Sequence, residues 1–466
     1  MNHVLFLIAF TLIVHFKNLR NSIILDDIPW FEKRKKNGLV KVTDLTSLIN
    51  RIHSHLYGGA TFGLNITLEH AFTLALNSLT ACLIYVALGS NTVSFWASLL
   101  WIANPINNQL TMWLNGRRYL INVILVMLMM ILPFGILLYP LTGLFQVTAF
   151  FSPILLGGWS LLAIPLLLTV CYKELREKVQ TRFSLLHDDD RRKFTAKRLI
   201  IVVKDYGHYF FKMLMPGICA FTYPMHHYWG ITEKGNKDAY SFNQDFARGI
   251  IALLLSVSAL FIFKGSMACF WAFLCLSTLQ WCAIIPVTQD LADRYASLPN
   301  VFMMFFVSYL VNTYCGVYAL PILASLITYY ICMLIEARKP YKGMIEYWEH
   351  ARYHFPQIPA PRKYEIDHYM RTDVNKAWVL CKDGLQNNNN EFVYLKQAAV
   401  CFKIIGDFPT AKVFAEEAMK NYYVGQQIIF EPQLKMFIDS LKPPSGTIIG
   451  KPSRQVKRAE ERKKSK

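Results

Sequence analysis

The stretch ARGIIALLLSVSALFIF, residues 247–263, decides the fold class of this chain. Arg248 is its only charged residue, and two similarly apolar segments follow at 267–287 and 313–335. Apolar runs of about 17–25 residues match the ~30 Å hydrocarbon core of a bilayer. A mean hydropathy of +0.27 over 466 residues, 54% of them hydrophobic, agrees with this interpretation. The sequence therefore predicts an all-α polytopic membrane protein.

The chain is predicted to contain about eleven membrane spans. They lie at roughly residues 4–16, 66–88, 92–105, 118–138, 141–157, 159–171, 206–225, 247–264, 267–287, 299–312 and 313–335. The Lys- and Arg-rich segment 172–204 is predicted to be cytoplasmic, because short basic loops stay inside. This orientation puts the N-terminus inside, and puts the first long loop (17–65) and everything after the last span outside. The first loop is itself basic, which argues the other way, although long loops follow the rule weakly.

The soluble parts are predicted to be helical as well. Apolar residues recur at three- and four-residue steps over 42–56, which is typical of an amphipathic helix on a membrane surface. Residues 392–423 predict a helix, a turn at Gly406 and a second helix, similar to a tetratricopeptide hairpin, although such arrays need about three units. We therefore expect a membrane domain (1–338) that includes the first external loop (17–65), a helical tetratricopeptide-like domain (339–443) and a basic disordered tail (444–466).

The charge and the cysteines exclude several other classes of protein. The formal charge of +18 comes from basic residues in loops and in the tail, where they orient helices and meet anionic headgroups. No nucleic-acid-binding motif accompanies them, so nucleic acid is not an expected partner. The ten cysteines show no CxxC spacing and mostly lie inside apolar segments, where they act as small hydrophobic residues. Neither a zinc site nor a disulfide framework is predicted.

Three polar clusters are predicted to lie at the same face of the membrane. The first is the adjacent pair Asp26 and Asp27, which can be a helix N-cap, a cation site or an acid/base centre. The second is WIANPINNQLTMWLNGRRYL (101–120), and the third is IPVTQDLADRYASLPN (285–300). Ionisable residues at a membrane boundary mark functional sites, although ordinary anchoring of span ends by Arg and Tyr is the alternative.

These stretches resemble the transmembrane and tetratricopeptide-repeat-containing O-mannosyltransferases and their bacterial relatives, which have the GT-C fold. In that family an Asp-Asp pair follows the first span, a HP-x-HTEAVAW-x-x-GR stretch follows the third, and an ERYLYLP stretch precedes the late spans. Here the corresponding stretches are LDDI (25–28), NPINNQLTMWLNGR (104–117) and ADRYASLP (292–299). The segment 68–88, which contains His70, is similar to the family's second span. The resemblance covers most of the membrane part.

The resemblance implies a glycosyltransferase that moves mannose or another hexose from a polyprenyl phosphate to a hydroxyl group of a protein Ser/Thr or a glycan. It would work at the non-cytoplasmic face of a bacterial inner membrane or of the endoplasmic reticulum. We assign the base to Asp26, while Asp27 positions the acceptor or binds a divalent ion (Mg or Mn), the one cofactor left open. Arg binds phosphate oxygens through its planar fork, so the expected donor-phosphate residues are Arg294 first, Arg117 second, then Arg118 and Tyr295. The expected pocket residues are Asn104, Asn108, Gln109, His70 and Gln289.

The chain departs from the family pattern in ways that keep other functions open. The His before Pro is Asn104 here, the His-Thr-Glu run is Asn107 to Gln109, and a Lys-Glu pair of a central span is replaced by Gly158 and Trp159. A changed donor or acceptor, or reduced activity, is therefore an alternative. A transporter or flippase of lipid-linked sugars is another, although the two halves of the chain lack the matching repeats expected of it. An inactive membrane scaffold of the same fold is the third.

Overall fold

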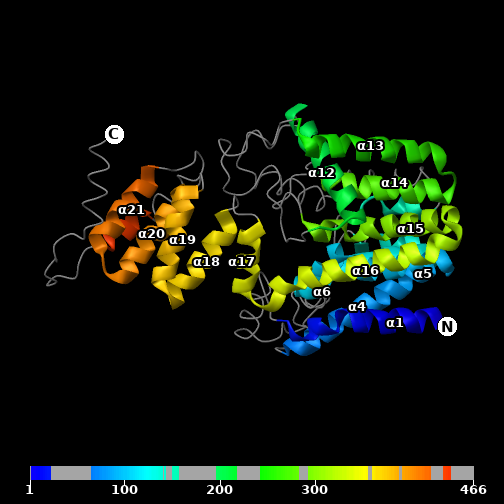
Figure 1. Ribbon diagram of the computed structural model, residues 1–466, viewed down its shortest axis with the longest axis horizontal. Coiled ribbons are helices and arrows are strands. Elements are labelled where there is room, and N and C mark those ends of the chain that lie inside the picture. Colours follow the sequence, from blue (N-terminus) through cyan, green and yellow to red (C-terminus); the bar gives the residue numbers. More distant parts are fainter. Residues whose placement is uncertain are drawn as a thin grey trace. The chain divides into compact units, whose positions relative to one another are not determined.

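The structure, a computed structural model, describes residues 2–21, 65–139, 141–142, 149–156, 196–217, 242–282, 292–354, 359–387, 391–420 and 434–441. Throughout these ranges the regular structure is helical (Figure 1), which confirms the all-α prediction for this part of the chain. The chain divides into two compact units between Tyr347 and Trp348. Each unit is described separately below.

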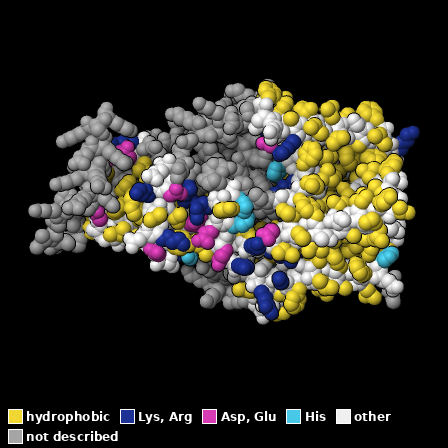
Figure 2. Space-filling view, viewed as in Figure 1, with side chains coloured by type: hydrophobic (Ala, Val, Ile, Leu, Met, Phe, Trp, Pro, Cys, Tyr) yellow, Lys and Arg dark blue, Asp and Glu magenta, His cyan; other side chains and the backbone are white. Residues whose placement is uncertain are grey.

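The first unit is a bundle of apolar helices. Its helices are α1 (Asn2–His15), α4 (Ile66–Ala87), α5 (Thr92–Ala103), α6 (Asn108–Met112), α7 (Arg117–Ile131), α12 (Ala196–Leu214), α13 (Gln244–Ile262), α14 (Ser266–Leu279), α15 (Ser297–Tyr314) and α16 (Ala319–Arg338). Within the described ranges, five helical segments are long and apolar enough to cross a membrane, or six if α6 and α7 form one bent span. Figure 2 shows hydrophobic side chains covering the face over α13 to α16, and Phe261 and Val317 are 82% and 86% exposed. The protein is a multi-pass membrane protein whose apolar helices face a lipid bilayer.

Polar caps explain where several spans begin. The Asn65 side chain accepts a hydrogen bond from the Leu68 N–H at the start of α4. The Asn243 side chain accepts from the Asp245 and Phe246 N–H groups at the start of α13. Such caps satisfy backbone donors that an apolar environment would leave unpaired. The helices at these two places agree with the predicted spans 66–88 and 247–264.

A bent segment lies between the third and fourth predicted spans. Helix α5 ends at Ala103, and the chain continues through Pro105 into α6, whose axis lies at 112° to α7. A Cβ atom on Gly116 would lie 2.5 Å from the carbonyl oxygen of Gln109, so only glycine allows α7 to begin this close to α6. We call residues 105–116 the bent segment.

Two predicted spans have different boundaries in the structure. The predicted start of the span 206–225 is wrong, because α12 (Ala196–Leu214) begins inside the segment predicted to be a loop, and residues 218–225 lie outside the described residues. Its buried side chains Ile201, Tyr209 and Met213 recur on one face, so the helix is amphipathic. The basic residues of its first turn are therefore compatible with a helix. Helix α7 stops at Ile131, well before the predicted 138, two residues ahead of Pro133.

Several predicted features lie outside the described residues. These are Asp26, Asp27 and Gln289, the amphipathic helix 42–56, the span 159–171, most of the span 141–157, most of the segment 172–204 and the tail 444–466. They stay predictions.

The second unit is built from short helices packed through small residues. It contains the end of α17 (Met344–His354), followed by α18 (Pro359–Thr372), α19 (Val374–Asn387), α20 (Glu391–Ile405) and α21 (Phe408–Lys420). Gly406, at a φ of +87°, makes the turn between α20 and α21, where a side chain would be strained. Asp407 then caps α21 by accepting the Thr410 N–H at 3.1 Å. The predicted helix–turn–helix over 392–423 is therefore observed up to Lys420.

Candidate functional site

Buried polar side chains gather at one end of the bundle, which we call the polar end. At this end α1, α5, α12 and α16 finish, and α4, α7 and α15 begin, with α6 beside the end of α16 (Figure 1). The side chains that define it are His15, Asn18, Glu69, His70, Asn104, Asn107, Asn108, Gln109, Arg117, Asp293 and Arg294, each at most 3% exposed. Segments far apart in the sequence, including parts of the predicted clusters 101–120 and 285–300, thus contribute to the polar end, while Asp26 and Asp27 lie outside the described residues.

Arg294 lies in an aromatic surrounding at the start of α15. Its Nε donates to the Tyr119 hydroxyl at 3.1 Å, and its Nη2 donates to the Tyr295 hydroxyl at 3.3 Å. The guanidinium carbon also lies 5.3 Å from the centre of the Trp113 ring and 4.7 Å from that of Tyr295. Trp281 stacks on Tyr295 with ring centres 4.1 Å apart, which holds the phenol ring in place. These contacts orient the guanidinium of an arginine that is 3% exposed.

A second arginine, Arg118, lies close to Trp113 and Tyr119. The guanidinium carbon of Arg118 lies 5.7 Å from the centre of the Trp113 ring and 5.1 Å from that of Tyr119. Two guanidinium groups beside the same Trp113 ring repel each other, and this repulsion is larger in a low-dielectric site than in water. An anion bound beside both would offset it, and guanidinium is the preferred partner of phosphate oxygens. The arrangement of Arg118 and Arg294 therefore suits a phosphate group.

Arg117 has a different surrounding from its neighbour. Its Nη1 lies 2.7 Å from Oε2 of Glu69, with both side chains fully buried, and its Nε donates to the Thr73 hydroxyl at 2.7 Å. A further N–H donates to the backbone carbonyl of Glu69. His70, next in the chain, is 1% exposed. The Arg117–Glu69 pair joins the start of α7 to the start of α4.

Asn104 is engaged in contacts with the backbone. Its Nδ2 donates to the Met213 carbonyl at 2.9 Å, at the end of α12, and its Oδ1 accepts the Ile106 N–H at 3.0 Å. The same Nδ2 lies 3.4 Å from Oδ1 of Asn300 on α15. The side chain thus fixes the entry into the bent segment against two other helices.

The side-chain NH2 groups of Asn107 and Asn108 each donate a hydrogen bond to a backbone carbonyl. The Asn107 Nδ2 donates to the Trp101 carbonyl at 2.8 Å, and the Asn108 Nδ2 donates to the Ala337 carbonyl at 2.9 Å. The Oδ1 atoms of both are buried and have no hydrogen-bond partner among the described residues. A buried amide oxygen of this kind can accept a hydroxyl proton from a ligand. Gln109, the next residue, is buried beside them.

The structure brings most of the predicted site residues together. Those at the polar end are Arg294, Tyr295, Arg117, Arg118, Asn104, Asn108, Gln109 and His70. Asp26, Asp27 and Gln289 lie outside the described residues. Among the residues that the structure describes, no group of three His, Cys, Asp or Glu side chains could hold a metal. Whether Asp27 binds a divalent ion therefore stays a prediction.

Sequence reasoning missed two residues that complete the site. Glu69 is the only acidic residue in the predicted span 66–88, and an ionisable residue inside a span is a signal of function. Tyr119 follows Arg118 directly, but nothing in the sequence indicates that it meets Arg294 from another helix. Lys212 and Asp293 also pair there, with Nζ and Oδ1 3.8 Å apart.

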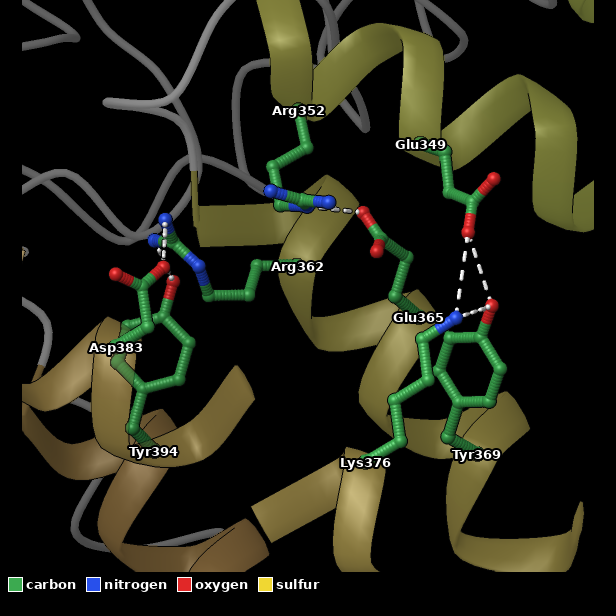
Figure 3. A network of polar contacts seen from close by, with 8 residues as sticks. All are labelled: Glu349, Arg352, Arg362, Glu365, Tyr369, Lys376, Asp383 and Tyr394. Atoms are coloured by element: carbon green, nitrogen blue, oxygen red, sulfur yellow. Dashed lines mark hydrogen bonds and ion pairs between the residues drawn. The ribbon is translucent and has the colours of Figure 1, made fainter. Parts of the chain in front are cut away.

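The second unit has a polar network of its own (Figure 3). Arg352 donates to Glu365 at 2.7 Å, Arg362 pairs with Asp383 at 2.8 Å, and Lys376 donates to the Tyr369 hydroxyl at 2.6 Å. Glu365 is fully buried, and this burial raises the pKa of its carboxyl group, although Arg352 acts in the opposite direction. This network joins neighbouring helices of the unit through pairs of opposite charge.

No model of a known protein family, no curated protein and no solved structure matches the chain.

Proposed function

We propose that the protein is a membrane glycosyltransferase of the GT-C type. It transfers mannose or another hexose from a polyprenyl phosphate to a hydroxyl group of a protein or a glycan. The observation that supports this proposal is the approach of Arg118 and Arg294 to the same Trp113 ring at the polar end, where Arg118 also lies near the Tyr119 ring and Arg294 donates to the Tyr119 hydroxyl. An enzyme that works outside the cytoplasm needs a lipid-linked donor, because nucleotide sugars do not reach that face.

Asp26 is the general base of the proposed reaction. A base must come within hydrogen-bond distance of the attacking hydroxyl group. The described chain after α1 continues to Asn21, whose side-chain amide donates to the sulfur of Met112, next to Trp113. An extended chain spans at most about 3.6 Å per residue, so Asp26 stays within about 18 Å of Asn21. The last described residue before the Asp-Asp pair thus contacts the bent segment, which supports the assignment.

The described residues supply the other parts of the reaction. Arg294 and Arg118 bind the donor phosphate and stabilise the charge that it gains as the glycosidic bond breaks. The amide oxygens of Asn107 and Asn108 accept protons from sugar hydroxyl groups. Arg117, which is paired with Glu69, positions the start of α7 and hence Arg118. No step is assigned to Mg or Mn, because Asp27 lies outside the described residues.

The second unit receives the acceptor in this proposal, as a helical domain of the tetratricopeptide type. Helix α16, which precedes this unit in the sequence, ends at the polar end: the Ala337 carbonyl accepts from Asn108, and Arg338 contacts His15. Few residues of the chain therefore separate the end of α16 at Arg338 from the start of the second unit at Trp348. Both the polar end and this unit are proposed to lie on the non-cytoplasmic side.

Transfer by the purified protein tests the function directly. A synthetic polyprenyl-phosphate mannose and a Ser/Thr-containing peptide serve as donor and acceptor. Asp26→Asn is expected to lower the rate by about 10²- to 10⁴-fold, since it removes a positioned base, while donor binding remains. Arg294→Ala is expected to weaken donor binding instead. Asp245→Asn, at the exposed start of α13, is the matched control and should change neither. Near-normal transfer by both Asp26→Asn and Asp27→Asn would contradict the mechanism.

One observation favours a second candidate, a transporter of lipid-linked sugars. Transporters bind substrates at broken helices, and α6 and α7 form such a broken span, with a bend of 112°. Reconstituted vesicles separate the two candidates. A transporter moves labelled lipid-linked sugar between leaflets without an acceptor, whereas the proposed enzyme transfers the sugar in detergent, where no leaflets exist.

A further inference from the structure

We propose that Tyr119 is a phosphate-binding residue of this site. Its hydroxyl group accepts a hydrogen bond from Arg294 and donates its own proton to an oxygen of the lipid-linked phosphate. The inference rests on the proposed function and assigns the phosphate a further ligand, from a position that the family resemblance does not include. The ligand class is a phosphate monoester or diester of a long-chain alcohol.

The hydrogen-bonding capacity of the phenol supports this role. A tyrosine hydroxyl group has one proton to donate and two lone pairs that accept. Nε of Arg294 donates to the Tyr119 oxygen at 3.1 Å, so that contact uses a lone pair and leaves the proton available. The side chain is 2% exposed, so bulk water is not the natural acceptor for that proton. A phosphate held by Arg294 would provide an acceptor close by.

The surrounding charges make Tyr119 a strong donor. Arg294 contacts its oxygen, and the guanidinium carbon of Arg118 lies 5.1 Å from the centre of its ring. A phenol that accepts from a cation is polarised, and hydrogen bonds in such a chain strengthen one another. An O–H that donates to an anionic oxygen forms a short, charge-assisted bond. Two cations and a polarised hydroxyl group therefore meet in a region that suits one anion.

The reaction predicts when this bond matters most. The bond between the anomeric carbon and the phosphate oxygen breaks, and its electron pair stays on that oxygen. The acceptor oxygen forms the new bond to the anomeric carbon, and its proton passes to the base. The phosphate changes from a diester with one negative charge to a monoester that can carry two. Tyr119 should therefore bind the polyprenyl phosphate product, and the transition state, more strongly than the donor.

Tyr206 provides a matched control within the same unit. It is also 2% exposed, and its hydroxyl group contacts the hydroxyl group of Ser256 at 2.6 Å, between α12 and α13. Tyr206→Phe and Tyr119→Phe each remove one buried oxygen atom and keep the ring. The two variants thus compare a tyrosine that contacts a neutral group with one that contacts a guanidinium.

The experiment measures binding without catalysis and then turnover. Binding of decaprenyl phosphate, of decaprenol and of inorganic phosphate is measured by titration of the full-length protein in detergent. Tyr119→Phe is expected to weaken decaprenyl phosphate binding about ten- to a hundredfold, the range of a hydrogen bond to a charged group. Decaprenol binding should be unchanged, kcat should fall, and KM for the sugar-bearing donor should rise less than product binding weakens. Competition by inorganic phosphate at similar concentrations would show that the lipid chain contributes little.

The outcomes separate the inference from the proposed function. Equal losses for decaprenyl phosphate and decaprenol, or the same pattern in Tyr206→Phe, would overturn the inference, because both indicate a structural role. Normal binding and turnover in Tyr119→Phe, with an active wild-type protein, would overturn the inference alone. A wild-type protein that neither binds decaprenyl phosphate nor transfers sugar would overturn both. Thermal unfolding of each variant is measured first, and binding is compared below the lower transition.

Discussion

The polar end of the membrane unit and the polar network of the second unit handle charge differently. In the second unit, Arg352 and Arg362 each face a carboxylate on a neighbouring helix (Figure 3). At the polar end, Arg294 contacts the ring and hydroxyl of Tyr295 and the hydroxyl of Tyr119, and it shares the Trp113 ring with Arg118. Pairs of opposite charge stabilise contacts between helices. We propose that the two guanidinium groups beside the Trp113 ring bind an anion, whereas the pairs of the second unit are structural.

The polar end also contains pairs of opposite charge, and breaking the shorter of the two described ones, Arg117–Glu69, should have the largest effect. Both side chains are fully buried, so Glu69→Gln leaves a guanidinium group in a region of low dielectric without its 2.7 Å carboxylate contact. Breaking a buried pair in this way typically costs about 3–5 kcal/mol. We expect a large fall in the thermal stability of the purified protein, measured by light scattering or intrinsic fluorescence.

Two variants sharpen this result. Glu416→Gln removes the carboxylate of an exposed pair with Lys412 and should cost less than about 0.5 kcal/mol. Glu69→Leu combined with Arg117→Met replaces the buried pair by apolar side chains and should recover much of the loss. If Glu69→Gln unfolds at the wild-type temperature, the pair does not hold α4 to α7 and Arg117 becomes a candidate phosphate ligand again.

The sequence predicted the apolar spans better than the contacts at their ends. Spans such as α4 and α13 are predicted because each contains a long apolar run with few charged residues, and this feature is local in the sequence. The start of α12 was missed because its first turn is basic and its apolar residues lie on one face only. Local composition alone does not show that such a turn is helical.

The candidate site was predicted as a set of segments, but the partners of its residues were not. The sequence indicated that Arg117, Arg118 and Arg294 share one face, and motif resemblance gave all three the same role. Only tertiary packing distinguishes them, because Glu69 comes from α4 and Tyr119 from α7. Partners from different helices leave no spacing signal in a single sequence.

The bent segment should be the next most sensitive place, since it supports the aromatic surrounding of Arg294. In Gly116→Ala the new methyl group would lie 2.5 Å from the Gln109 carbonyl oxygen and 3.0 Å from Cα of Leu110, so the backbone must shift. Overpacking of this kind typically costs about 1–3 kcal/mol. We expect lower thermal stability together with weaker decaprenyl phosphate binding, because Trp113 and Arg118 flank the glycine in the chain.

Gly217→Ala is the matched control, since a methyl group there would meet nothing within 4 Å. It should leave both measurements unchanged. A Gly116→Ala protein that loses stability but binds decaprenyl phosphate normally would show that the bent segment does not position the phosphate site, and would weaken the comparison drawn above.

The smallest expected effect concerns Glu365 in the second unit, where two influences oppose each other. Burial raises the pKa of this carboxyl group, and the hydrogen bond and charge of Arg352 lower it by a smaller amount. A raised pKa in the folded state means that the folded unit binds this proton more tightly than the unfolded chain. The resulting stabilisation is complete below the ordinary Glu pKa of about 4.3 and is lost as the pH rises through the raised value. We therefore expect the second unit to resist pulse proteolysis less as the pH is raised over this window.

Glu365→Gln should make resistance less dependent on pH, whereas Glu417→Gln, at an exposed pair with Lys420, should keep the wild-type dependence. A Glu365→Gln protein with the wild-type pH profile would show that the pKa of this carboxyl group is the same in the folded and unfolded states, because Arg352 offsets burial in full.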